Sequence, residues 1–176
     1  MNEAIELKKE IINDLLKLIP EAIKEISTPQ DQKICFVALY RSDYDPLVGL
    51  IQIGFEDVRQ SNFEEGGIWM AWNSGDQPYK YQNDLKEQSL KEKEKRFINL
   101  FDPDEYYGEW WKQCIDVMNQ VSMKLNDYDW NSVFKDITDD FVVYIDWEGL
   151  DVENGELESC IPKNKLMKLK EKGIVK

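Results

Sequence analysis

Histidine is absent from this chain of 176 residues. Without an imidazole, Ser-His-Asp and Cys-His catalytic arrangements, histidine-ligated zinc sites and imidazole acid–base catalysis at neutral pH are all excluded. Cysteine is scarce, because Cys35, Cys114 and Cys160 lie far apart and form no C-x-x-C pair. Zinc knuckles and redox dithiols are therefore excluded too, and we expect three reduced thiols, as suits a reducing cytoplasm.

Long apolar runs are also missing. The longest, Ile34 to Tyr40, has the length of a strand and is far shorter than the roughly 20 residues that span a bilayer. Residues 1–6, MNEAIE, have neither the basic nor the apolar region of a secretory signal. We therefore expect a cytoplasmic protein without a membrane segment, and the length predicts a single domain over residues 1–176.

Basic side chains are outnumbered by acidic ones, 22 to 35, and the net charge is -13. Binding to nucleic acid or to anionic lipid is disfavoured, because such binding depends on lysine and arginine. The chain is nevertheless 42% hydrophobic and 12% aromatic, which provides the apolar side chains that a disordered chain lacks. The composition predicts a folded, acidic protein.

Hydrophobic periodicity and turn residues divide the chain into helices and strands. Three- and four-residue apolar spacing and helical propensity predict helices over residues 3–26, 84–101, 109–126 and 165–172. We expect Pro20 to kink the first helix or to start a new one. Apolar runs bounded by turn residues predict strands over residues 33–41, 47–55, 68–73 and 141–147.

The order of these elements favours an α+β fold, because most strands are segregated from the helices. We predict a mainly antiparallel sheet packed against N-terminal, central and C-terminal helices. Residues 33–41 and 47–55 are joined by the turn-forming segment 42–46 and should form a hairpin. Residues 33–41 are apolar on both faces, which indicates a central strand.

The negative charge is concentrated late in the chain. Residues 127–158 contain 11 acidic and 1 basic side chain, whereas residues 159–176 contain 1 acidic and 6 basic ones. Two interpretations stay open, a solvated acidic face and a docking surface for a basic partner. The second predicts partner-binding residues at Asp127, Asp129, Trp130, Asp139, Asp140, Asp146, Trp147, Glu148, Asp151 and Glu153.

Aromatic residues lie among these carboxylates, and tryptophan and tyrosine often anchor protein interfaces. On the docking interpretation, Trp130 or Trp147 supplies the buried anchor contact. A second patch is suggested by aromatic residues with polar neighbours, namely Tyr79, Tyr81, Tyr106, Tyr107 and Trp110.

The carboxylates also suggest chemistry, because hard cations take oxygen ligands and paired carboxylates support glycoside hydrolysis. Residues 146–155 resemble a calcium-binding loop only loosely, without its glycine placement and terminal glutamate. We therefore predict no catalytic residue, no metal ligand and no cofactor.

Several short motifs resemble those of small bacterial α+β domains grouped as immunity proteins of polymorphic toxin systems, including the SUKH-like set. These motifs are the first amphipathic helix, residues 36–40 (FVALY), residues 72–73 (WN), residues 139–144 (DDFVVY) and a closing helix that begins at Ile161-Pro162 and ends at Gly173. The resemblance implies a cytosolic protein that binds and blocks a cognate toxin domain, often a nuclease.

Together, the charge and the resemblance predict an acidic binding protein that neutralises a toxin by masking a basic surface, and not an enzyme. The expected partner is a basic protein rather than nucleic acid or a membrane. Two alternatives remain, a carboxylate- or metal-dependent hydrolase and a mimic of nucleic-acid charge that sequesters a DNA-binding enzyme.

Overall fold

The structure, a computed structural model, describes residues 2–102, 105–148 and 150–176. These residues form five α-helices and one four-stranded sheet with the strand order β3-β2-β1-β4. The helices are α1 (Asn2–Lys24), α2 (Glu56–Ala71), α3 (Gln88–Ile98), α4 (Glu109–Leu125) and α5 (Lys163–Glu171). The strands are β1 (Ile34–Tyr40), β2 (Leu50–Phe55), β3 (Gln82–Asn83) and β4 (Ile137–Asp146).

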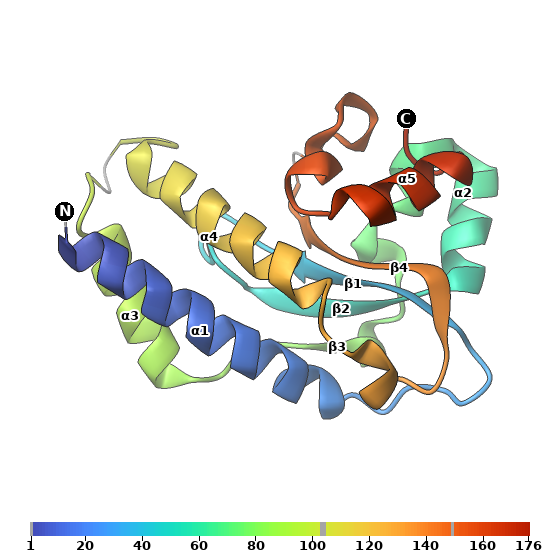
Figure 1. The fold of residues 1–176 in the computed structure, drawn as a ribbon, viewed down its shortest axis with the longest axis horizontal. Coiled ribbons are helices and arrows are strands. Elements are labelled where there is room, and N and C mark those ends of the chain that lie inside the picture. Colours follow the sequence, from blue (N-terminus) through green and yellow to red (C-terminus); the bar gives the residue numbers. More distant parts are fainter. Residues whose placement is uncertain (1, 103–104, 149) are drawn as a thin grey trace.

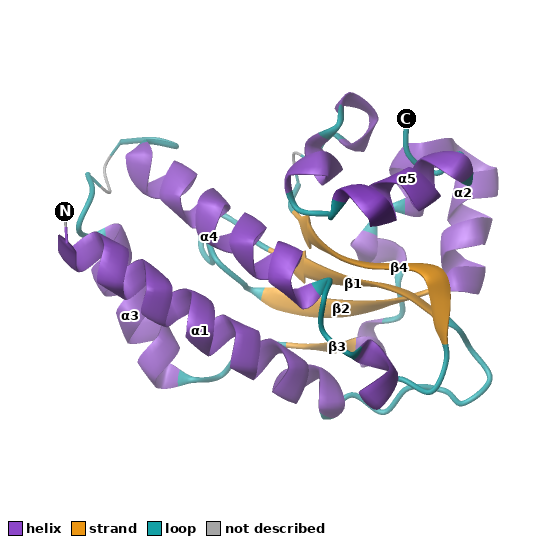
Figure 2. Ribbon diagram, in the orientation of Figure 1, coloured by secondary structure: helices purple, strands orange, loops and turns teal. Residues whose placement is uncertain are grey.

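Helix α1 packs against α3 and α4, whereas α5 packs against β4 and α2 against β2 (Figures 1 and 2). The predicted helices are confirmed as α1, α3, α4 and α5. Pro20 lies inside α1, which continues through it as one helix and does not restart there. Gly173 follows α5 with a φ of 71°, a left-handed conformation that ends helices readily. None of the helices in the described ranges combines the length and apolar character needed to cross a membrane.

The predicted hairpin and the α+β fold class are confirmed. β1 pairs antiparallel with β2 and parallel with β4, so it is an interior strand, as its two apolar faces indicated. β2 also pairs antiparallel with β3, so the sheet is mainly antiparallel with one parallel pair.

The predicted strand over residues 68–73 is wrong. Residues 68–71 belong to α2, which is interrupted at Gly67, where φ is 74° and ψ is -155°. A short apolar run is compatible with a helix or a strand, and in this structure the segment is helical. Within this run Trp69 is 58% exposed whereas Ala71 is buried, so one helical side faces solvent.

The free edge of β4 is capped by side chains. Asn126 accepts from the Val143 N–H at 3.0 Å and donates to the Val143 carbonyl at 2.7 Å. Lys165 donates to the Phe141 carbonyl at 2.9 Å, and Lys168 donates to the Asp139 carbonyl at 3.2 Å. These contacts use backbone groups that would otherwise offer a template for pairing with another chain. Two of the lysines of α5 therefore donate hydrogen bonds to the free edge of β4.

An aromatic cluster joins the sheet to α2 and to the C-terminus. The rings of Phe36 and Trp72 each pack near Tyr144, with centroid distances of 5.3 and 5.2 Å. The Tyr144 hydroxyl donates to the Trp72 carbonyl, and the Trp72 indole N–H donates to the Ile174 carbonyl. A Cβ on Gly54 would lie 2.2 Å from the Phe36 ring, so this position of β2 needs glycine.

Candidate functional site

The predicted acidic surface is divided by the fold into several environments. Asp127, Asp129 and Asp151 are exposed, as predicted for a solvated or docking surface. Glu153 is also exposed and lies 3.3 Å from the Lys176 ammonium. The remaining six predicted residues lie in the core, in an ion-pair network or at a hollow beside the sheet.

Trp130 does not face a partner, and its predicted role as an interface anchor is wrong. Its side chain is 2% exposed and packs on Phe134 and Phe141, with centroid distances of 5.8 Å for both rings. Its indole N–H donates to the Leu125 carbonyl at 2.7 Å. A tryptophan with its polar atom satisfied inside the protein is a core residue.

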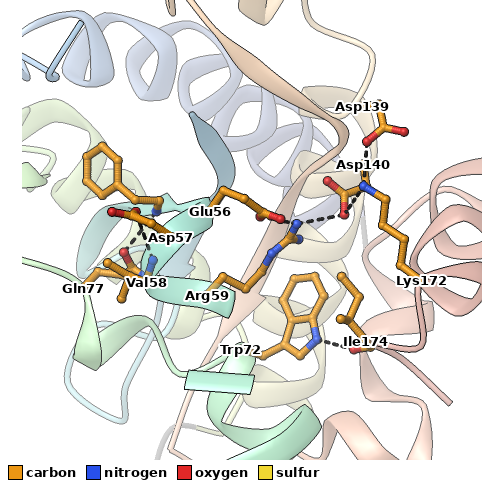
Figure 3. Close-up of polar contacts among 11 residues, drawn as sticks. Glu56, Asp57, Val58, Arg59, Trp72, Gln77, Asp139, Asp140, Lys172 and Ile174 are labelled. Carbon is orange, nitrogen blue, oxygen red and sulfur yellow. Dashed lines mark hydrogen bonds and ion pairs between the residues drawn. The ribbon is translucent and has the colours of Figure 1, made fainter. Parts of the chain in front are cut away.

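Asp140 and Asp139 belong to an ion-pair network that connects α2, β4 and the segment after α5 (Figure 3). The Arg59 guanidinium lies 2.8 Å from Asp140 and 2.5 Å from Glu56. Lys172 lies 3.1 Å from Asp140 and 2.6 Å from Asp139. Asp140 is 1% exposed, so the prediction that it is a surface carboxylate is wrong. The neighbouring sequence did not reveal this burial, because the countercharges of Asp140 come from distant parts of the chain.

The charges of this network lower the pKa of both carboxyl groups. Burial alone would raise the pKa of Asp140, but the charges of Arg59 and Lys172 and the hydrogen bond from Lys172 outweigh burial and lower it. The hydrogen bond from Lys172 lowers the pKa of Asp139. The network therefore neutralises part of the predicted acidic charge, and its ion pairs join α2, β4 and the end of α5.

The last predicted residues, Asp146, Trp147 and Glu148, lie at a groove. The groove consists of two hollows, of about 570 and about 470 Å³, that share Tyr40, Trp147 and Glu148. Tyr40 and Asp146 are the final residues of β1 and β4, so the parallel pairing of these strands places the groove at their carboxyl ends. Both volumes lie within the range of ordinary ligand-binding pockets.

The groove gathers the exposed aromatic side chains. Tyr44, Trp69, Tyr79 and Tyr107 are 95%, 58%, 77% and 37% exposed, and each of them lines the groove. Tyr106 is 80% exposed, and its ring centroid lies 4.1 Å from that of Tyr107. Within the described ranges these five are all the exposed aromatic residues, so the groove and its rim hold every one.

The aromatic patch was predicted only in part. Tyr79, Tyr106 and Tyr107 are exposed as expected, whereas Tyr81 is buried and Trp110 is half-buried. Tyr44 and Trp69 were missed. Tyr44 lies in the turn between β1 and β2, where a large aromatic residue has no core to pack into, and that placement is readable from the sequence.

The groove is acidic. Its lining contains the carboxyl groups of Asp43, Asp146 and Glu148, and one cationic side chain, that of Arg41. Asp43 accepts a hydrogen bond from the Tyr107 hydroxyl at 2.9 Å. Glu148 is exposed to solvent.

Asp146 is buried, unlike Asp43 and Glu148. It is 9% exposed, and its side chain accepts a hydrogen bond from the Ser74 hydroxyl. Burial raises the pKa of Asp146 to about 6, against hydrogen bonds from Ser74 and the Trp147 backbone that lower it. The groove therefore contains a carboxyl group that titrates near neutral pH, which is a common property of functional sites.

Arg41 is 3% exposed, and its guanidinium carbon lies 3.8 Å from the centre of a Trp111 ring. Burial lowers its pKa to about 10, although Cys114, Asp43 and Tyr107 act in the opposite direction. Within the described ranges, no group of three or more acidic or cysteine side chains is arranged to hold a metal ion.

The fold and the groove define a class of architecture, an α+β protein with an acidic, aromatic groove at the carboxyl ends of two parallel strands. Comparison with known protein families, with curated proteins and with solved structures gives no match.

Proposed function

We propose that this chain is a binding protein of the immunity type, which captures a basic toxin domain in the groove and masks its cationic surface. The observation that carries the proposal is that the exposed aromatic side chains gather at one place, together with the carboxylates of Asp43, Asp146 and Glu148. Tyrosine and tryptophan carry much of the energy of protein interfaces, and carboxylates supply complementarity to a basic partner.

The groove replaces Trp130 as the source of anchor contacts. Trp147 keeps the predicted role, because it lines both hollows. Trp69 and Tyr79 present large exposed rings over which the arginine or lysine side chains of a partner can stack. Exposed carboxylates outside the groove, such as Asp127, Asp129 and Asp151, contribute long-range attraction that speeds encounter with a cationic surface.

The proposal is tested by affinity capture with matched variants. The groove variant combines Trp69→Ala with Glu148→Lys. The control variant combines Met167→Ala with Glu171→Lys on α5, which removes one exposed apolar side chain and reverses one exposed charge, as in the groove variant, at residues that do not line the groove.

We expect the wild-type chain and the control variant to capture one basic protein from a lysate of the source organism, and the groove variant to lose it. About 1 M salt should release it, because the screening length falls to about 3 Å. When the captured protein is expressed in cells, co-expression of the wild-type chain should relieve the toxicity of that protein, and co-expression of the groove variant should not. Equal capture by the groove variant and the control variant would contradict the proposal. If the captured partner is a non-toxic DNA-binding enzyme, the result favours the alternative in which the chain mimics nucleic-acid charge.

A further inference from the structure

The larger hollow of the groove, of about 570 Å³, is lined on one side by residues that are paired across the sheet. Leu50 of β2, Tyr40 of β1 and Asp146 of β4 are paired in one row, and Gln52 of β2 pairs with Gln82 of β3 in another. Side chains of residues paired across neighbouring strands lie on the same face of a sheet. One face of the sheet therefore forms the floor of the hollow.

Aromatic rings stand around this floor. Trp69 of α2 and Tyr79 are 58% and 77% exposed, and Trp147 is half-buried. All three line the hollow together with Tyr40. Because Trp69 and Tyr79 are largely exposed in the folded chain, a side chain from outside can reach their rings without any change of fold.

The larger hollow is also acidic. Among the described residues, its lining contains the carboxyl groups of Asp146 and Glu148 and no lysine or arginine, whereas Arg41 lines the smaller hollow of the groove. Burial raises the pKa of the Tyr40 hydroxyl, and the charges of Glu148 and Asp146 raise it further. The two carboxylates therefore act on the same part of the hollow, and a cation is the ligand whose charge complements them.

A guanidinium group suits this combination of rings and carboxylates better than an ammonium group. A guanidinium is planar and weakly hydrated, so its faces stack on aromatic rings while its edge forms hydrogen bonds with a carboxylate. Glu148 is exposed and can accept such hydrogen bonds. An ammonium group is a strongly hydrated point charge, and ring faces replace its water poorly. The hollow therefore favours arginine over lysine.

We propose that the larger hollow binds the guanidinium group of an arginine side chain, which stacks on the rings that line the hollow and pairs with the carboxylate of Glu148. The charge of Asp146 adds to the attraction. On the proposed function, on which this assignment rests, the arginine belongs to the captured basic partner.

Nuclear magnetic resonance titration of the purified chain tests the site at about pH 7.5, where Asp146 is mainly ionised. The probe is N-acetyl-arginine amide. We expect it to shift the indole N–H signals of Trp69 and Trp147 with a dissociation constant of about 1 mM. The signal of Trp130, which is buried in the core, should not move. The absence of any shift at Trp69 and Trp147 would overturn the proposal.

Two further probes separate the charge from the shape of the ligand. The citrulline derivative has nearly the same shape without the charge and should bind about tenfold more weakly or worse. The lysine derivative keeps the charge without the planar group and should bind about threefold more weakly or worse. Equal binding of either derivative and the arginine probe would contradict a guanidinium site.

A pair of variants assigns the site to the larger hollow. Asp146→Asn with Glu148→Gln removes its two negative charges and should weaken the arginine probe by about tenfold or more. Glu21→Gln with Glu171→Gln changes the net charge equally at exposed helical residues outside the hollow and should leave binding unchanged. Circular dichroism checks that both variants fold. If the two folded variants bind the probe equally, the assignment is wrong.

The guanidinium site and the proposed function fail in different ways. If the wild-type chain captures a basic partner through the groove but does not respond to the arginine probe, the guanidinium site is wrong and the proposed function stands. If the arginine probe binds as expected but the groove and control variants of the capture experiment behave alike, the proposed function is wrong and the guanidinium site stands.

Discussion

The buried carboxyl group of Asp146 predicts a pH-dependent change in stability. Its pKa is about 6 in the folded protein, whereas the ordinary value is 3.8. Because the folded pKa is the higher one, ionisation of Asp146 opposes folding above about pH 6, and this cost disappears as the pH falls toward about 4. A difference of about two pKa units corresponds to about 3 kcal/mol at full ionisation.

Asp146→Asn removes the ionisation while keeping the shape of the side chain. The amide replaces one acceptor oxygen by an NH₂ group, which costs about 1 kcal/mol through the loss of one hydrogen bond from Ser74 or the backbone. We therefore expect the variant to be about 2 kcal/mol more stable than the wild type at pH 8, and about 1 kcal/mol less stable at pH 4.

Urea denaturation of both proteins across this pH range measures the difference in the free energy of unfolding. Asp139→Asn is the matched control, because Lys172 lowers the pKa of Asp139 and the stabilisation from that pair is present above the ordinary pKa and lost as the pH falls. The control should therefore change with pH in the opposite direction. A difference for Asp146→Asn that does not vary with pH would refute the reasoning.

Three further predictions concern the core. Gly54→Ala should destabilise the fold by about 1–3 kcal/mol because the new Cβ would lie 2.2 Å from the Phe36 ring, whereas Gly75→Ala, whose new Cβ would lie 3.2 Å from Asn73 Oδ1, should cost less in the same thermal unfolding assay. Asp140→Asn should cost about 3 kcal/mol or more in urea denaturation, since it breaks a buried pair with Arg59; an unchanged midpoint would argue against the network. Thiol labelling of the native protein at mildly alkaline pH should be no faster than unfolding, because burial raises the pKa of all three cysteines, Cys35, Cys114 and Cys160.

Periodicity in the sequence was sufficient for the elements with a long, one-sided pattern. The stripe in α1 and the two apolar faces of β1 predicted a helix and an interior strand, and both are confirmed. The parallel pairing of β1 with β4 was not predicted, because an apolar strand has no residue that reveals its partner or its direction. Residues 68–71 were misassigned because four apolar residues after a glycine do not distinguish a strand from a helix.

The candidate site was harder to predict, because neighbours in the sequence are separated by the fold. Asp139 and Asp140 are adjacent, yet one is exposed and the other buried, since alternate residues of β4 face opposite directions. The partners of Asp140 are Arg59 and Lys172, which are distant in the sequence. The groove likewise combines Tyr44, Trp69 and Trp147 from three separate segments, so no linear pattern contains it.

The pairing of β1 with β4 has a consequence for synthesis on the ribosome. Val37 pairs with Val143, a separation of 143 − 37 = 106 residues. At a translation rate of about 5–20 residues per second, about 5–20 s pass between the synthesis of β1 and that of its parallel neighbour β4. The nascent chain thus carries the apolar strand ICFVALY with an unpaired edge during that interval. We expect ribosome-bound chains that stop before β4 to bind chaperones more strongly than chains that include it, and equal binding would contradict this order of assembly.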